Sequence, residues 1–387
     1  MMKKHYFLLL VLSFAFSFAS AQEDQTITIT EYQLSPEFVC KTSGVKNQQL
    51  AGTCWSYATV SFLESELLRM GMGEFDFSEI WFARCAYYQK AIRFIRLQGK
   101  ANFSQGGQAH DVMNVIREFG VLAEADYKGL EYGSPIHNHT EVEAGLLGYL
   151  KSIIEKKESK LTTGYRAAIN GILDAYFGVA PQTVTYSGKG YTPKELAVAL
   201  KLKPDDYVEL TSYSHHPFYK TFDLEIPDNW SHDQYYNVPI DELVETIVYA
   251  LKKGYSITWD GDVSEKTFHH VKGLAFWPEI DWDELSQEER KGYFEKPGKE
   301  KVITQELRQE TFDEQTTTDD HLMHLTGVYK DQNGTRYFQI KNSWGSTSNK
   351  CGGFLYMSES FLRLKTVAVL LHKEGIPSAI QSKLNIR

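Results

Sequence analysis

The sequence predicts an α+β fold in which a helical segment comes first, a β segment comes last and a long middle segment separates them. Residues 54–70 carry apolar side chains at helical spacing and stop at Gly71, a residue that favours a helix C-terminus. Residues 325–329 and 337–341 are short apolar runs joined by a DQNG turn, which is typical of a β-hairpin. A helical lobe that faces a β lobe leaves a natural cleft between the two.

The other expected elements follow from the same patterns. Helices are predicted at residues 78–96, 110–119, 142–158 and 241–253, and strands at residues 27–32, 256–259, 353–357 and 366–372. The highly charged stretch 281–314 is expected to lie on the surface. Because the chain has 387 residues, two lobes or one domain with a large insertion is the natural organisation.

The start of the sequence has the pattern of a secretory signal peptide. Lys3 and Lys4 precede an apolar run over residues 6–18, and Ala19-Ser20-Ala21 follows it. The run is shorter than the roughly 20 apolar residues that a membrane helix needs. We therefore expect cleavage after Ala21, no membrane association afterwards, and an exported chain that is periplasmic or extracellular.

Charge and cysteine content exclude some classes of protein. The formal net charge of −9 argues against a nucleic-acid partner, which usually requires a basic face. The chain has four cysteines, too few for a disulfide scaffold of this size. If one of them is a catalytic thiol, at most one disulfide can form among the other three. Cys85 is expected to pack in a helix core, and the pairing of Cys40 and Cys351 stays open.

Cys54 is the candidate nucleophile because it begins a predicted helix. A cysteine nucleophile must lose its proton, and both a helix N-terminus and a nearby imidazolium lower a thiol pKa. Gln48 lies six residues upstream and can donate its amide hydrogen to a developing oxyanion, together with the backbone N–H of Cys54. The expected partner base is His321, oriented by the side-chain amide of Asn342. Trp344 could shield their hydrogen bond from water.

These segments resemble the active-site motifs of papain-type cysteine peptidases. The matching stretches are NQQLAGTCWSYA at residues 47–58, NSWG at residues 342–345, and the His321 segment with Gly327 after it. The long separation of Cys54 from His321, and local similarities such as GGQ at residues 106–108, are similar to the bleomycin hydrolase and aminopeptidase C branch. The resemblance implies a papain-like, two-lobed fold with a large, mainly helical insertion.

The resemblance also implies roles for individual residues. Cys54, His321, Asn342 and Gln48 would be catalytic. Gly106, Gly107 and Trp344 would bind substrate, since glycine lets a peptide backbone come close. The substrates would be peptides or proteins, with no metal and no cofactor.

The expected domain organisation has one peptidase domain, residues 22–387, after the signal peptide at residues 1–21. Within it we expect a helical lobe at about 45–127, an insertion at about 128–240, a β lobe at about 241–372 and a C-terminal tail at 373–387. In the branch that this sequence resembles, the tail lies in the cleft and restricts cleavage to free N-termini. Whether residues 373–387 do so here stays open.

The hypothesis is therefore hydrolysis of peptide bonds through a thioester, most simply as an aminopeptidase. A cysteine endopeptidase with an open cleft and a catalytically silent peptide-binding protein on the same fold are the alternatives. The sequence leaves open whether the chain forms a homo-oligomer. The pairs His215-His216 and His269-His270 are interpreted as solvated loop residues, and His324 is not expected to share a metal with His321, because residues three apart in a strand face opposite ways.

Overall fold

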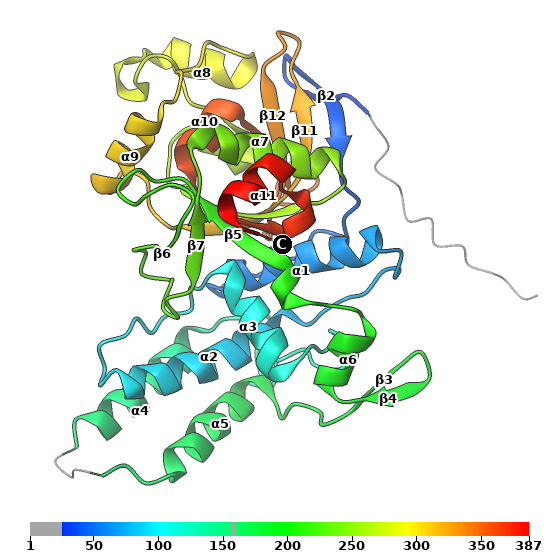
Figure 1. The fold of residues 1–387 in the computed structure, drawn as a ribbon, viewed down its shortest axis with the longest axis vertical. Coiled ribbons are helices and arrows are strands. Elements are labelled where there is room, and N and C mark those ends of the chain that lie inside the picture. The colour runs from blue at the N-terminus through cyan, green and yellow to red at the C-terminus, as the bar shows by residue number, and fades with distance from the viewer. Residues whose placement is uncertain (1–24, 157–159, 387) are drawn as a thin grey trace, which may run out of the picture.

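The computed structural model describes residues 25–156 and 160–386 of the chain. Its elements form a lower, helical lobe and an upper lobe built on a large sheet (Figure 1). The predicted signal peptide at residues 1–21 lies outside the described residues. Within the described ranges, no helix has both the length and the apolar character needed to cross a membrane.

The helical lobe is formed by the first half of the chain. Its elements are α1 (Cys54–Arg69), α2 (Glu79–Arg96), α3 (Ala109–Phe119), α4 (Thr140–Ile154), α5 (Gly164–Phe177), α6 (Pro193–Ala199) and the hairpin β3 (Val184–Tyr186) and β4 (Lys189–Tyr191). Helix α1 is buried along most of its length, because α2 and α3 pack against it within the lobe and strands of the sheet pack against it from outside. The lobes therefore meet along α1.

Polar side chains fix the starts of the helices that flank α1. The Ser78 side chain accepts a hydrogen bond from the backbone N–H of Trp81, so it caps α2. The Asp111 side chain accepts a hydrogen bond from the backbone N–H of Gln108 at 3.0 Å, at the start of α3. These caps explain why the predicted helices at residues 78–96 and 110–119 begin where the sequence suggested.

The β lobe is built on one sheet with β11 near its centre. The strands of this sheet and its edge pair are β1 (Ile27–Ile29), β2 (Tyr32–Val39), β5 (Tyr207–Thr211), β6 (Thr221–Asp223), β7 (Gln234–Asn237), β8 (Ile257–Gly261), β9 (Phe268–His269), β10 (Leu274–Ala275), β11 (His321–Lys330), β12 (Arg336–Lys341), β13 (Phe354–Ser358) and β14 (Thr366–His372). The order is β6-β7-β5-β14-β8-β11-β12-β13-β10-β9, and β2 pairs with both β1 and β11. The first half of β11 pairs with β8 and the second half with β2.

The two faces of the sheet pack against different helices. The remaining helices are α7 (Ile240–Lys252), α8 (Gln287–Glu295), α9 (Gln305–Asp313), α10 (Glu359–Lys365) and α11 (Ser378–Leu384). Leu322 and Leu370 join the apolar core around α1, whereas their strand neighbours Met323 and Leu371 join the core around α7. Since successive strand residues face opposite sides, α1 covers one face of the sheet and α7 covers the other.

The middle segment at residues 128–240 is divided between the lobes. Its helices α4 and α5 pack against α2 and enlarge the helical lobe. Its strands β5, β6 and β7 instead extend the sheet, because β5 pairs with β14. The predicted insertion is therefore helical in its first part and becomes an edge of the β lobe in its last part.

The tail from residue 373 to residue 386 lies on the α7 face. The side chains of Ile380 and Leu384 are buried in the same core as α7. The Lys383 ammonium pairs with Glu242 of α7 at 2.6 Å. The described part of the tail is thus separated by the sheet from α1 and from Cys54.

Candidate active site

Cys54 is the first residue of α1, so its sulfur lies at the positive end of the helix dipole. The backbone of Leu322, the residue after His321, hydrogen-bonds this sulfur. Burial nevertheless raises the pKa of Cys54 to about 12, and nearby carboxylates contribute to the rise. The largest cause of this rise is the loss of hydration at the buried thiol.

His321 begins β11 and is held by Asn342, which directly follows β12. The Nε2–H of His321 donates to Oδ1 of Asn342 at 2.9 Å. Burial lowers the pKa of His321 to about 4, although the hydrogen bond to Asn342 acts in the opposite direction. The resting imidazole is therefore neutral, and its Nδ1 is the nitrogen that Asn342 leaves free to accept a proton. The backbone of Leu322, the next residue, contacts the Cys54 sulfur, so the start of β11 lies beside Cys54.

The indole ring of Trp344 packs against the imidazole ring of His321. Its ring centroid lies 5.0 Å from that of His321, with an angle of 31° between the planes. The hydrogen bond between His321 and Asn342 therefore lies under an indole ring that shields it from water. This packing matches the predicted shielding; a direct contact of Trp344 with substrate stays a prediction.

Gln48 is fixed beside the same group of residues. Its Oε1 accepts a hydrogen bond from the Ser343 hydroxyl at 2.6 Å, and its Nε2 donates to the carbonyl of Ala51 at 2.9 Å. A primary amide has two N–H donors, so one remains for an oxyanion. The structure thus brings Gln48 next to the residue that follows Asn342.

Side chains from other parts of the protein pack closely against Gly106 and Gly107. A Cβ on Gly106 would stand 1.8 Å from Oδ2 of Asp228, and a Cβ on Gly107 would stand 2.5 Å from Oδ2 of Asp111. Glycine is therefore required here by the packing of the protein's own side chains. Binding of substrate by the backbone of this pair stays a prediction.

Carboxyl groups gather around Cys54, and the sequence did not single them out. The charges of Asp319, Asp260 and Asp228 all act on the thiol and raise its pKa. Asp320, the residue before His321, faces Asp262 and accepts a hydrogen bond from the Thr318 hydroxyl at 2.7 Å.

His270 is also part of the site, although its sequence suggested a solvated loop. It is half-buried, and its Nδ1 accepts a hydrogen bond from Nδ2 of Asn342 at 3.2 Å. Its ring centroid lies 4.7 Å from that of Trp344. The solvated interpretation is wrong for His270 because the loop after β9 folds back onto the NSWG segment.

His215, His216 and His324 have hydrogen-bond partners of their own. Glu225 bridges His215 and His216 through contacts of 3.1 and 2.8 Å to their Nε2 atoms. The carboxylate therefore already satisfies both rings. His324 is buried with its Nδ1 2.8 Å from the Ser61 hydroxyl, so it does not share a ligand position with His321. The four cysteines are free, and Cys85 is buried as predicted.

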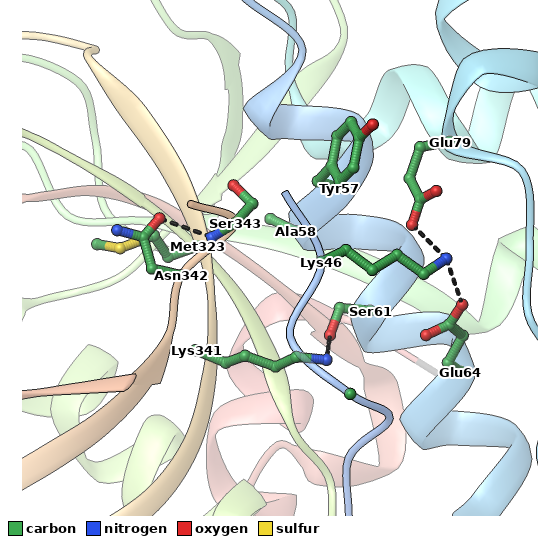
Figure 2. Close-up of a pocket in the computed structure, with 11 residues that line it drawn as sticks. Lys46, Tyr57, Ala58, Ser61, Glu64, Glu79, Met323, Lys341, Asn342 and Ser343 are labelled. Atoms are coloured by element: carbon green, nitrogen blue, oxygen red, sulfur yellow. Dashed lines mark hydrogen bonds and ion pairs between the residues drawn. The ribbon is translucent and has the colours of Figure 1, made fainter. Parts of the chain in front are cut away.

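A small cavity behind the site separates α1 from the start of the NSWG segment (Figure 2). The cavity measures about 10 Å³, roughly the room for one water molecule. Lys46 reaches across α1 to Glu64 and Glu79, at 3.3 and 2.6 Å (Figure 2). On the opposite wall, the Lys341 ammonium donates to the Ser61 hydroxyl at 2.7 Å. The bond from Lys341 of β12 to Ser61 of α1 thus links the two lobes next to Asn342.

Comparison with known proteins agrees with this geometry. The model of the Peptidase C1-like family matches residues 185–386, and that of the papain family cysteine protease matches residues 14–197. Aminopeptidase G from Lactobacillus delbrueckii subsp. lactis is 24% identical over 396 residues, which cover 89% of this chain and 84% of the relative. Aminopeptidase C from Listeria innocua serovar 6a is 22% identical over 376 residues, covering 86% and 81%.

A solved structure has the same fold. The crystal structure of pepw from Lactobacillus rhamnosis HN001 superimposes with a TM-score of 0.70 at 17% identity, over 91% of this chain and 84% of that one. The predicted α+β, papain-like, two-lobed fold is confirmed by this similarity together with the two family matches.

Proposed function

Since the chain belongs to the Peptidase C1-like family and is a papain-type cysteine peptidase, we propose that Cys54 is its nucleophile and that it acts as an aminopeptidase. The observation that carries the site assignment is the junction at the start of β11. There the backbone of Leu322 touches the Cys54 sulfur, and the preceding His321 is held by Asn342 at 2.9 Å.

Acylation begins from a neutral thiol and a neutral imidazole. His321 takes the thiol proton at Nδ1 while the Cys54 sulfur attacks the substrate carbonyl carbon, and the carbonyl π electrons move to oxygen. The free amide hydrogen of Gln48 and the backbone N–H of Cys54 stabilise that oxyanion. When the tetrahedral intermediate collapses, the C–N bond breaks and the imidazolium gives its proton to the leaving amine.

In deacylation, water is the nucleophile and Cys54 is the leaving group. Neutral His321 accepts a proton from water, the resulting hydroxide adds to the thioester carbonyl, and the C–S bond of Cys54 breaks. The proton returns to the sulfur through His321. The hydrogen bond to Asn342 keeps the ring in one orientation throughout, so that the same Nδ1 serves both half-reactions.

The support for aminopeptidase action comes from the relatives. The similar curated proteins are named aminopeptidases, and the chain covers more than four-fifths of the length of each of those cited above. One observation favours the alternative of an endopeptidase. The described tail lies on the α7 face of the sheet, so residues 373–386 do not close the cleft against a longer chain.

A pair of substrates separates these functions. The aminocoumarin amide of leucine carries a free amine, and its N-acetylated form does not. An aminopeptidase hydrolyses the first and spares the second, whereas equal rates on both would indicate endopeptidase action. Failure of a thiol-reactive epoxide to label Cys54 under reducing conditions would favour the third alternative, a silent peptide-binding protein.

We also propose that the chain is exported, on the pattern of residues 1–21 alone. Cell fractionation and N-terminal sequencing of the recovered protein test this proposal. A chain beginning at Gln22 outside the cytoplasm supports it, and a full-length chain retained in the cytoplasm contradicts it.

A further inference from the structure

Side-chain carboxyl groups from separate segments meet at the strip of chain that contains Gly106 and Gly107. Asp228 lies against Gly106, where a Cβ would stand 1.8 Å from its Oδ2. Asp319 accepts a hydrogen bond from Nε2 of Gln108 at 2.8 Å. Asp260 pairs in register with Leu322 across β8 and β11, so its side chain shares the face that touches Cys54. We call these residues, Asp228, Asp260 and Asp319, the carboxylate cluster.

Within residues 25–156 and 160–386, no group donates a hydrogen bond to the Asp260 carboxyl, although Asp260 is only 3% exposed. The carboxyl of Asp260 faces the carboxyl of Asp319. Both groups are acceptors when ionised, so they can form a hydrogen bond with each other only if one of them is protonated. Burial and the neighbouring Asp319 raise the pKa of Asp260 well above its usual value, and burial raises that of Asp319 to about 7.

Asp319 accepts a hydrogen bond from Gln108, and Asp228 accepts hydrogen bonds from Asn102 and Ser104. Asp260 is therefore the member of the cluster without a donor among the described residues. A buried carboxyl group without a donor is costly, and a positive charge bound at the cluster would offset that cost.

The positive groups nearby are already engaged. The Lys90 ammonium donates to the backbone carbonyls of Ser104 and Gly106, and burial lowers its pKa. The His110 ring bonds the Glu209 carboxylate at 2.7 Å. Neither side chain forms a hydrogen bond with the carboxylate cluster.

We propose that the carboxylate cluster binds an ammonium group of the peptide substrate on the N-terminal side of the scissile bond. This inference rests on the proposed function, because it concerns the substrate of the same site. An α-ammonium and the side-chain ammonium of lysine share this chemistry. The ammonium would donate charge-assisted hydrogen bonds to Asp319 and Asp228. The negative charge of Asp260 would add electrostatic attraction.

The proposal accounts for the position of the tail. Residues 373–386 lie across the sheet, so recognition of a free amine has to come from side chains within the cleft. Binding of an ammonium group at the carboxylate cluster would also change the pKa of Cys54. Asp319, Asp260 and Asp228 raise the pKa of Cys54 in the resting protein, and a bound cation opposes their field. Substrate with a free amine would therefore favour removal of the thiol proton.

The test compares Asp319→Asn and Asp228→Asn with a control, Asp283→Asn. Asp283 is an exposed residue that pairs with Lys266 far from this strip, so its variant removes a negative charge outside the cluster. The substrates are aminocoumarin amides of leucine, of N-acetyl-leucine and of N-acetyl-lysyl-leucine. These offer an α-ammonium, no ammonium and a side-chain ammonium.

We expect Asp319→Asn and Asp228→Asn to lower kcat/KM for the free-amine substrate roughly ten- to hundredfold. The residual hydrolysis of the N-acetyl-leucine substrate, which an aminopeptidase cleaves slowly at most, and the activity of the Asp283→Asn variant should both be unchanged. A selective loss on N-acetyl-lysyl-leucine would instead assign the cluster to a lysine side chain. Equal losses on all three substrates, or no loss on either ammonium-bearing one, would overturn the proposal.

A binding measurement separates this inference from the proposed function, because it needs no turnover. In the Cys54→Ala background, leucinamide should raise the melting temperature and N-acetyl-leucinamide should not. Adding Asp319→Asn should abolish the effect of leucinamide. If leucinamide stabilises both backgrounds equally, the carboxylate cluster is not its site, whatever the wild-type enzyme hydrolyses.

Discussion

His270 accepts a hydrogen bond from the side-chain amide of Asn342 at 3.2 Å. Its other nitrogen lies 2.7 Å from the Ser348 hydroxyl, which fixes the ring. Burial lowers the pKa of His270, so the ring stays neutral near pH 7 and its Nδ1 keeps the lone pair that the amide needs. Asn342 is therefore oriented from one side by His270 while it orients His321 on the other.

His270 is thus a positioning residue, and its removal should impair turnover without weakening substrate binding. We predict that His270→Ala lowers kcat about tenfold and leaves KM nearly unchanged, because one buried hydrogen bond is lost. His270→Gln, whose amide oxygen can still accept, should recover part of the loss. Steady-state kinetics of both variants provide the check, and an equal loss in the two would indicate general structural damage instead.

Gln48 should matter through its free amide hydrogen. We predict that Gln48→Ala lowers kcat by about a hundredfold or more, the usual cost of one oxyanion donor. Ser343→Ala is the matched control, because it removes the hydroxyl that holds Oε1 of Gln48 but keeps the donor. Its effect should be clearly smaller, and the reverse order would contradict the oxyanion role.

The thiol of Cys54 should react more readily when a neighbouring charge is removed. Asp319 raises the pKa of Cys54, and its own pKa is raised to about 7. Asp319 is therefore charged above that pH and neutral below it. Asp319→Asn should speed alkylation of Cys54 by iodoacetamide at about pH 8 and have little effect at about pH 6. An increase that is the same at both values would show that charge is not the cause.

The ion pairs that Lys46 forms behind the active site should contribute to stability. Lys46 pairs with Glu64 and Glu79, both of which are buried. We predict that Lys46→Met lowers the free energy of unfolding by about 3 kcal/mol, because it leaves buried carboxylates without a cation. Burial already raises the pKa of Glu79 to about 8, so proton uptake there keeps the loss from being larger.

Denaturant unfolding measures this effect against an exposed pair. Lys291 bonds Glu295 at 3.4 Å within one turn of α8, and Lys291→Met should change stability by no more than about 0.5 kcal/mol. Similar losses for Lys46→Met and Lys291→Met would contradict a special role for the buried group.

The parts of the site that local sequence encodes could be predicted. The helix that begins at Cys54, the Gln48 segment and the NSWG motif that carries Asn342 each lie in one short stretch, and each was placed correctly. The pairing of His321 with Asn342 was expected because a catalytic histidine needs an orienting group and because both segments resemble papain-type motifs.

What could not be predicted depends on contacts between distant segments. Asp228, Asp260 and Asp319 lie in three loops or strands that only the folded sheet and the glycine strip bring together. His270 looked like one of a solvated pair until the NSWG segment folded over it. The charged stretch around α9 likewise hides Arg308, which is buried because its guanidinium donates to backbone carbonyls of other segments.

In the proposed mechanism, peptide hydrolysis passes through a thioester on Cys54. The most direct test is to quench wild-type enzyme in acid during turnover of a leucine p-nitrophenyl ester and to map the adduct by mass spectrometry. We expect one leucyl group, carried by the peptide that contains Cys54 and absent from the Cys54→Ala variant. A leucyl adduct on another residue, or undiminished turnover by Cys54→Ala, would contradict this mechanism.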